Sequence, residues 1–76
     1  MKISIEYCSM WNYLPKASSL EASLKNNFPD ADISLISSGG GVFEICLDDE
    51  LIFSKKSLKR FPENGEVEKL INNRIM

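Results

Sequence analysis

The chain opens with a strict alternation of apolar and polar residues. Ile3, Ile5 and Tyr7 are separated from one another by single polar residues. A period of two is typical of a β-strand with one buried face, because successive side chains of a strand point to opposite sides. The segment from Lys2 to Tyr7 therefore predicts a strand.

A helical pattern follows between about Asn12 and Asn27. Its apolar residues recur at three- and four-residue spacing and are Ala17, Leu20 and Leu24. Asn12 is a candidate N-cap, and Pro15 is tolerated only in the first turn, where its missing N–H leaves no hydrogen bond unmade. Pro29 then follows two asparagines and ends the helix.

Three shorter segments predict three further strands. Ile33 and Leu35 alternate with polar residues, and the turn-forming run Gly39–Gly41 interrupts this pattern. The segment 42–47 alternates again, and an acidic connection joins it to the apolar segment 51–54, which indicates a hairpin.

A second helical stripe lies near the end of the chain. It predicts a helix over about 64–75, with Glu66 in the first turn and Arg74 in the last, both of favourable sign for the helix dipole. The apolar residues of this stripe are Val67, Leu70, Ile71 and Ile75.

The order β-α-β-β-β-α predicts the architecture. The first two strands, joined through a helix, should be parallel with a right-handed crossover, and tight connections make the third strand antiparallel to its neighbours. Polar alternation leaves one sheet face open, so both helices should cover the other face. We expect an α/β fold, a two-layer sandwich of thioredoxin-like type with a mixed four-stranded sheet and two helices on one face. The expected core is Ile3, Ile5, Ala17, Leu20, Leu24, Ile33, Leu35, Phe43, Ile45, Val67, Leu70 and Ile71.

Composition and charge narrow the classes of function. Of 76 residues, 43% are hydrophobic and 26% charged, which indicates one ordered domain over residues 1–76. The net charge is −2, and acidic residues surround the basic group Lys55, Lys56, Lys59 and Arg60. We expect that group to be a solvated surface, so no nucleic acid is predicted as a partner. No segment approaches the roughly 20 apolar residues that span a bilayer, so no membrane partner is predicted either.

The chain lacks histidine and contains only two cysteines. The first fact excludes Ser-His and Cys-His catalysis within the chain, and no metal site is expected. The second argues against a disulfide framework, and no charged leader precedes a long apolar run. We therefore expect a cytoplasmic protein.

One cysteine, Cys8, lies at the junction of the first strand and the first helix. This is the layout of the Cys-x-x-Cys loop of thioredoxin-like proteins, where the partial positive charge of a helix N-terminus favours the thiolate. Trp11 occupies the position of the second sulfur. Cys8 is thus a candidate nucleophile without a resolving thiol in its loop.

Short matches to one family run through the chain in order. They are Tyr7-Cys8 at the loop entry, Tyr13 and Lys16-Ala17 after the loop, Gly40-Gly41-Val42-Phe43-Glu44-Ile45, Phe53-Ser54-Lys55-Lys56 and Arg60-Phe61-Pro62. The chain thereby resembles the selenoprotein W family, also called Rdx. Its small members share a thioredoxin-like β-α-β-β-β-α fold and a Cys-x-x-Cys or Cys-x-x-selenocysteine loop.

The resemblance implies thiol- or glutathione-dependent redox chemistry, and Trp11 limits what carries over. The second loop position of the family bears the selenium or second sulfur, so only the role of Cys8 is retained. A sulfenic acid or mixed disulfide on Cys8 would need an external thiol such as glutathione to remove it. No bound cofactor is expected, and glutathione would be a co-substrate.

Two functions remain open on the sequence. In the first, the chain is a monothiol oxidoreductase with Cys8 as nucleophile, and Met10, Trp11 and Tyr13 form the walls that position glutathione or a protein thiol. In the second, the fold is a redox-inactive interaction module with a protein partner at the Cys8 loop, and Cys8 is a small buried hydrophobic residue.

Two structural expectations concern the thiols. Cys8 should be at least partly accessible and close to the first turn of the first helix, with Trp11 beside it. Cys8 and Cys46 should not form a disulfide, because the start of the third strand, near Val42, should lie beside Cys8. At about 3.4 Å per residue, Cys46 would then lie roughly 13 Å away, beyond the approximately 7 Å limit for a bridge.

Overall fold

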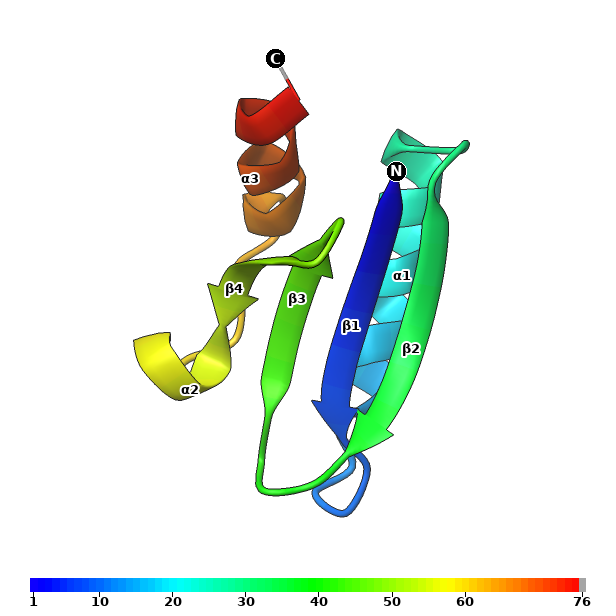
Figure 1. Cartoon of the computed structure of the whole chain (residues 1–76). Coiled ribbons are helices and arrows are strands. Elements are labelled where there is room, and N and C mark those ends of the chain that lie inside the picture. The colour runs from blue at the N-terminus through cyan, green and yellow to red at the C-terminus, as the bar shows by residue number, and fades with distance from the viewer. Residues whose placement is uncertain (76) are drawn as a thin grey trace.

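A computed structural model describes residues 1–75 and shows a sheet backed by helices (Figure 1). The chain order is strand, helix, three strands and two helices. The elements are β1 (Lys2–Cys8), α1 (Leu14–Asn27), β2 (Asp32–Ser38), β3 (Phe43–Leu47), β4 (Glu50–Ser54), α2 (Lys55–Leu58) and α3 (Glu66–Ile75).

The four strands form one mixed sheet in the order β2-β1-β3-β4. β1 is parallel to β2, and β3 is antiparallel to both β1 and β4. α1 connects these two parallel strands, so the predicted β-α-β crossover is present. The predicted mixed sheet is confirmed.

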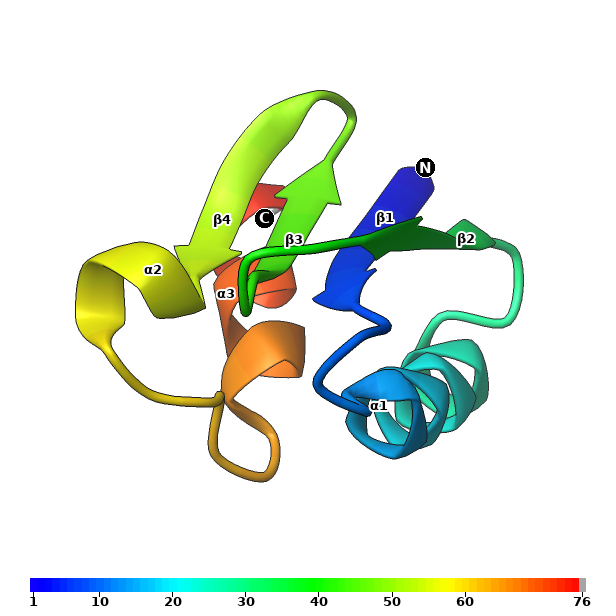
Figure 2. The same cartoon turned by 90° about the horizontal axis from the view of Figure 1, so that it is seen from below.

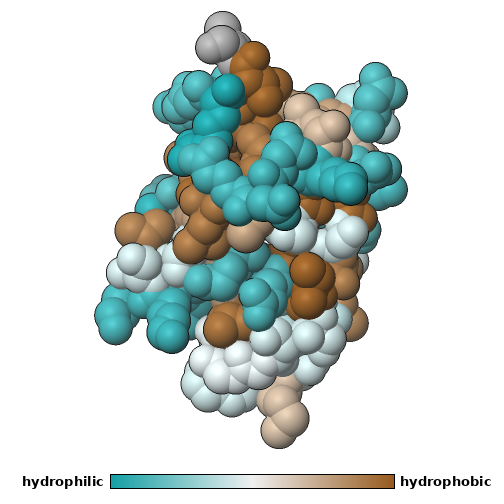
Figure 3. Space-filling model, in the orientation of Figure 1, coloured by the Kyte–Doolittle hydropathy of each residue, from teal (hydrophilic) through white to brown (hydrophobic). Residues whose placement is uncertain are grey.

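Both long helices lie on the same face of the sheet. Seen from below, α1 and α3 are side by side beneath the strands, and nothing in residues 1–75 covers the opposite face (Figure 2). The two-layer arrangement predicted from the polar alternation is therefore confirmed. The open face is a mixture of hydrophilic and hydrophobic surface (Figure 3).

The short helix α2 was not predicted. Ser54 ends β4 and caps α2, because its hydroxyl accepts a hydrogen bond of 3.1 Å from the Ser57 N–H. The same hydroxyl donates to the Glu44 carboxylate at 2.6 Å. A serine followed by two lysines is a weak helix signal, so the sequence alone did not predict that Ser54 caps a helix.

The predicted N-cap of α1 was wrong. Asn12 has a φ of 59°, and Tyr13 is the N-cap, without a side-chain hydrogen bond. Asparagine tolerates the left-handed conformation better than most residues, so Asn12 serves the tight turn before the helix instead of capping it. Pro15 does lie in the first turn, as predicted.

The core agrees with the sequence in its centre and differs at its margins. Leu20, Ile33, Leu35 and Leu70 are only partly buried, and the prediction omitted Leu47, Ile52 and Phe53, which are buried. The sheet pairing explains why both Ile52 and Phe53 of β4 are buried. Ile45 pairs with Phe53 and Cys46 with Leu51, so Ile52 is the extra residue of a bulge. The bulge lets two successive side chains of β4 be buried, which simple alternation does not predict.

None of the helices within residues 1–75 combines the length and apolar character needed to cross a membrane.

Candidate functional site

Hydrogen bonds on both sides hold the end of β1, where Cys8 lies. The Cys8 N–H donates to the Val42 carbonyl at 2.9 Å, and the Ser9 N–H donates to the Ser38 carbonyl at 3.0 Å. The Ser37 hydroxyl also contacts the Ser9 hydroxyl at 2.9 Å. Cys8 is therefore held in position between its two neighbouring chain segments.

The loop 9–13 returns the chain to Cys8 before α1 begins. The Asn12 N–H donates to the Ser9 carbonyl at 3.2 Å, and the Tyr13 N–H donates to the Cys8 carbonyl at 3.1 Å. Tyr13 is the N-cap of α1, so the backbone of Cys8 lies at the helix start, as the sequence predicted.

The expectation that Cys8 would be accessible was wrong. Its exposed fraction is 0%. The end of a strand was expected to be exposed, but β2 and β3 flank this strand end and loop 9–13 folds back toward it. A reagent in solution cannot reach the Cys8 sulfur in this conformation.

Trp11 lies against the glycine turn that precedes β3. Gly41 is buried, and a Cβ atom on it would overlap the six-membered ring of Trp11. Gly41 precedes Val42, the residue whose carbonyl accepts the hydrogen bond from Cys8. The indole thus connects loop 9–13 to the chain segment that is hydrogen-bonded to Cys8.

The same loop exposes large apolar side chains. Met10 is 84% exposed and Trp11 61% exposed, although one side of the indole contacts Gly41. Tyr13 is half-buried. The three residues predicted to line a partner site therefore differ, since two face solvent and the third joins the core.

Tyr13 connects the loop to an aromatic cluster. The ring centroids of Trp11 and Tyr13 are 6.2 Å apart, those of Tyr13 and Phe61 4.8 Å, and those of Phe61 and Phe43 5.2 Å, all edge to face. Lys16 and Lys55 place their ammonium groups 4.7 and 5.3 Å from the Phe61 centroid. This role of Phe61 was not predicted from the sequence, because the aromatic residues meet only through tertiary packing.

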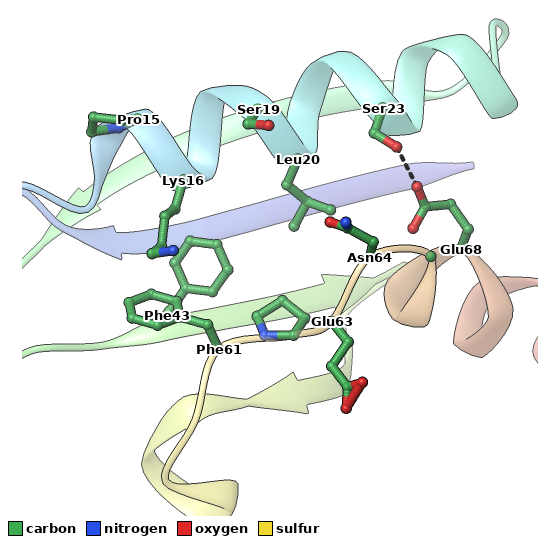
Figure 4. Close-up of a pocket in the computed structure, with 12 residues that line it drawn as sticks. Pro15, Lys16, Ser19, Leu20, Ser23, Phe43, Phe61, Glu63, Asn64 and Glu68 are labelled. Carbon is green, nitrogen blue, oxygen red and sulfur yellow. Dashed lines mark hydrogen bonds between the residues drawn. The ribbon is translucent and has the colours of Figure 1, made fainter.

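A groove of about 290 Å³ begins beside this cluster. It lies between α1 and the segment that leads into α3, with Phe43 and Phe61 at one end (Figure 4). At the other end the Ser23 hydroxyl donates a hydrogen bond to the Glu68 carboxylate. Leu20 and Asn64 project between these ends.

The second thiol lies elsewhere on the sheet. Cys46 pairs with Ser4, whereas Cys8 is bonded to Val42 at the other end of β3. Both cysteines are free. The register matches the predicted one, so the roughly 13 Å separation estimated from strand geometry excludes a bridge in the folded chain. Among residues 1–75 there is also no cluster of three or more metal-ligating side chains.

Arg60 fixes the segment between the aromatic cluster and α3. Its two terminal nitrogens donate to the two Glu66 carboxylate oxygens at 2.7 and 2.8 Å, and the Glu63 N–H also donates to Glu66, at 2.9 Å. The hydrogen bonds from Arg60, and then that from Glu63, lower the pKa of Glu66 to about 2 from its usual 4.5. This pair sets the start of α3 and thereby one wall of the groove.

We expect the Arg60–Glu66 pair to make stability depend on pH in the acid range. The folded pKa of Glu66 lies below the unfolded one, so its contribution is present above about pH 4.5 and disappears as the pH falls toward about 2. Glu66→Gln should lower the free energy of unfolding by about 1 kcal/mol at neutral pH, since solvent screens the pair. Urea unfolding measured from neutral to acid pH should show a smaller decline in the free energy of unfolding for the variant than for the wild type. Parallel curves would show that Glu66 does not carry this dependence.

The model of the Rdx family matches residues 2–73. The chain belongs to the Rdx family. The matched range runs from β1 into α3 and includes the Cys8 loop, the glycine turn and the aromatic segment around Phe61.

Curated relatives agree with this membership. The chain is 32% identical to migration and invasion enhancer 1 of Mus musculus over 85 residues, covering 95% of this chain and 74% of the relative. It is 30% identical to the Bos taurus protein of the same name over 87 residues, covering 97% of this chain and 76% of the relative.

Solved structures share the fold. A selenoprotein W-related protein from Vibrio cholerae superimposes with a TM-score of 0.92 at 26% identity, over 99% of this chain and 96% of its own. A Bordetella parapertussis protein gives a TM-score of 0.91 at 24% identity, over 96% and 95% of the two chains, which bears on the fold alone. Rdx membership and the selenoprotein W-like fold suggest a redox-related role.

Proposed function

We propose that this Rdx domain is a monothiol redox protein whose nucleophile, Cys8, reacts after loop 9–13 moves away from it. The observation that carries the proposal is the position of Cys8, whose carbonyl is hydrogen-bonded to the N-cap of α1 in the loop that connects β1 to that helix. This is the place at which thioredoxin-like folds bring a sulfur to a helix N-terminus.

The chemistry needs a partner thiol. The Cys8 thiolate would attack one sulfur of glutathione disulfide, forming a Cys8–glutathione disulfide and releasing one glutathione thiolate. A second thiolate, from glutathione or a protein, would then attack the glutathione sulfur and release the Cys8 thiolate. Cys46 lies too far along β3 to supply this second thiolate. A reducing compartment such as the cytoplasm suits this cycle, because it returns Cys8 to the thiol state.

Loop movement is a necessary step of this proposal, since Cys8 is fully buried. Loop 9–13 offers a route for that movement. Its contact with the rest of the chain includes the Trp11 ring on Gly41, and much of that ring is already in solvent. Loss of this contact would loosen residues 10–12, while the hydrogen bonds of Ser9 to β2 and the ladder between β1 and β3 would stay in place.

A second function is favoured by a separate observation. Met10 and Trp11 are the most exposed large apolar side chains of the described residues, and they lie at the loop that the family uses for its chemistry. Aromatic and methionine side chains are common at the centres of protein interfaces. In this alternative the loop binds a protein partner and Cys8 remains an inert part of the fold.

Thiol modification of the folded protein separates the two functions. In a Cys46→Ser background, glutathione disulfide should add one glutathione to Cys8, detected by intact mass, and Trp11→Ala should raise the rate by about tenfold or more as burial decreases. Cys8→Ser in a chain that keeps Cys46 should remain unmodified and should keep the wild-type fold, because little volume changes.

The same experiment identifies the alternative. A Cys8 that reacts in denaturant but stays unmodified in both the folded parent and the Trp11→Ala variant would overturn the monothiol function. That result would leave the docking function in place. A mass increase in the Cys8→Ser variant would show that the nucleophile was assigned wrongly.

A further inference from the structure

The two edges of the sheet differ in how they are protected from other chains. At one edge, β4 has only five residues, contains the bulge opposite Ile45 and Cys46, and leads directly into α2. At the other edge, β2 has seven residues in unbroken register with β1. Short strands, bulges, prolines and lysines are the usual protections of an exposed edge, and β2 has none of them.

The backbone groups that β2 leaves unpaired follow from its bonds to β1. The Asp32 N–H donates to the Met1 carbonyl, and the Ser38 carbonyl accepts from the Ser9 N–H. Even-numbered residues of β2 therefore direct their N–H and C=O groups toward β1, because these directions alternate along a strand. Ile33, Leu35 and Ser37 direct theirs outward, to the free side of the sheet.

We propose that β2 pairs with β2 of a second copy of this chain, antiparallel, across a two-fold axis at Leu35. In that register Leu35 faces the second copy's Leu35, and Ile33 faces the second copy's Ser37. Directly opposed residues of this type exchange both of their hydrogen bonds, so all three outward-facing N–H and C=O pairs are satisfied on each strand. A shift of the axis leaves some of these groups unpaired. The product is a continuous eight-stranded sheet.

The charges of β2 permit this pairing. Asp32 is the only charged residue of the strand. In the antiparallel register it faces the second copy's Ser38, so like charges are not opposed. Ser34 faces the second copy's Ile36 on the open face, where Ile36 is 46% exposed in the single chain. A parallel pairing would instead bring the two Asp32 side chains to the same end.

The helices also fit the paired sheet. α1 packs against both β1 and β2 and lies behind them (Figure 1). With strands about 4.8 Å apart, the two-fold axis places α1 roughly 10 Å from the same helix of the second copy, which is an ordinary packing distance for two helices.

The side of α1 that would meet its copy lies opposite the groove. Lys16, Ser19 and Ser23 line the groove on the α3 side of the helix. At 100° per residue, the opposite side carries Leu14, Ser18, Glu21 and Lys25. Leu14 is exposed, and this side has charges of both signs, which suits an antiparallel contact between identical helices.

Charge substitution at each edge tests the interface. In sedimentation equilibrium over about a hundredfold range of concentration, the wild-type chain should shift from monomer to dimer. Ile36→Lys should remain a monomer across that range, because an edge lysine opposes strand pairing. Leu51→Lys is the matched control, since Leu51 is 52% exposed on the opposite edge, and it should dimerise like the wild type.

A cysteine cross-link tests the register and does not depend on the lysine variants. In a Cys46→Ser background, a mixture of Ser34→Cys and Ile36→Cys proteins should form a heterodimeric disulfide, because opposed Cα atoms of this pair type lie about 4.5 Å apart. Each variant alone should form few cross-links, because its cysteine and the same cysteine of the second copy are diagonal neighbours, with Cα atoms about 8 Å apart.

Three outcomes would overturn the proposal. They are a wild-type monomer at every concentration, a dimer that survives Ile36→Lys, and equal cross-linking by a single cysteine variant. If the wild type stayed monomeric but bound an added extended peptide along β2, the edge would accept a strand from another protein and the second copy would be the wrong partner. None of these outcomes depends on the reactivity of Cys8.

Discussion

Replacing Phe43 with alanine is expected to lower the free energy of unfolding by about 3–5 kcal/mol. Phe43 is buried at the start of β3, pairs with Tyr7 across the sheet and contacts Phe61 edge to face. The substitution removes most of the side chain and leaves a cavity at the end of the groove. The total free energy of unfolding of a domain of this size is only about 4–11 kcal/mol, so much of the variant protein should be unfolded or close to unfolding at 37 °C.

Urea unfolding followed by circular dichroism gives the measurement for Phe43. Phe43→Leu is the matched control, because it keeps an apolar side chain and should cost about 1–2 kcal/mol. A cost below about 1 kcal/mol for Phe43→Ala would mean that β3 does not begin inside the core as described.

Gly41→Ala is expected to destabilise the chain by about 2–4 kcal/mol, for two separable reasons. The φ of Gly41 is +72°, a conformation that L-residues adopt at a cost. In addition, the new methyl group would occupy the space of the Trp11 ring. The ring would have to move, and loop 9–13 with it.

Gly40→Ala separates these two reasons. Gly40 has nearly the same φ, +70°, but a Cβ atom there meets nothing within 4 Å. This variant should cost only about 1 kcal/mol, the backbone part alone. The difference in unfolding free energy between the two variants then measures the Trp11 contact. Equal costs would show that the indole does not pack on Gly41 in solution.

The pair of glycine variants also bears on the proposed redox function. If Trp11 keeps loop 9–13 in place over the end of β1, Gly41→Ala should increase the rate at which glutathione disulfide modifies Cys8, and Gly40→Ala should change it little. The comparison uses chains that both keep Trp11, so it complements the direct removal of the indole.

Local periodicity was enough to predict most of the fold. The alternation of Ile3, Ile5 and Tyr7 and the spacing of Ala17 and Leu24 depend on side chains close together in sequence. Each pattern has one arrangement that buries its apolar side. The parallel pairing of β1 and β2 followed from the intervening helix, and the hairpin followed from its short connection. The family match then agreed with this order across residues 2–73.

The candidate site was predicted only in part, because its properties depend on residues far apart in the chain. The sequence located Cys8 at the end of a strand and beside a helix start, and both placements are correct. It did not predict that Cys8 is completely buried. The segments bonded around Cys8, at Ser38 and Val42, lie about 30 residues away in the chain, so local sequence patterns do not predict this burial.

The same reason applies to the cluster around Phe61 and to the bulge at Ile52. Phe61 meets Tyr13 and Phe43 from three separate segments, and Ile52 is buried because β4 shifts its register against β3. By itself, the sequence determined which segments form strands and helices and which faces they bury, since those preferences are local. Only the tertiary structure decided which thiol is shielded, which aromatic rings meet and which sheet edge stays open, because packing between distant segments sets these properties.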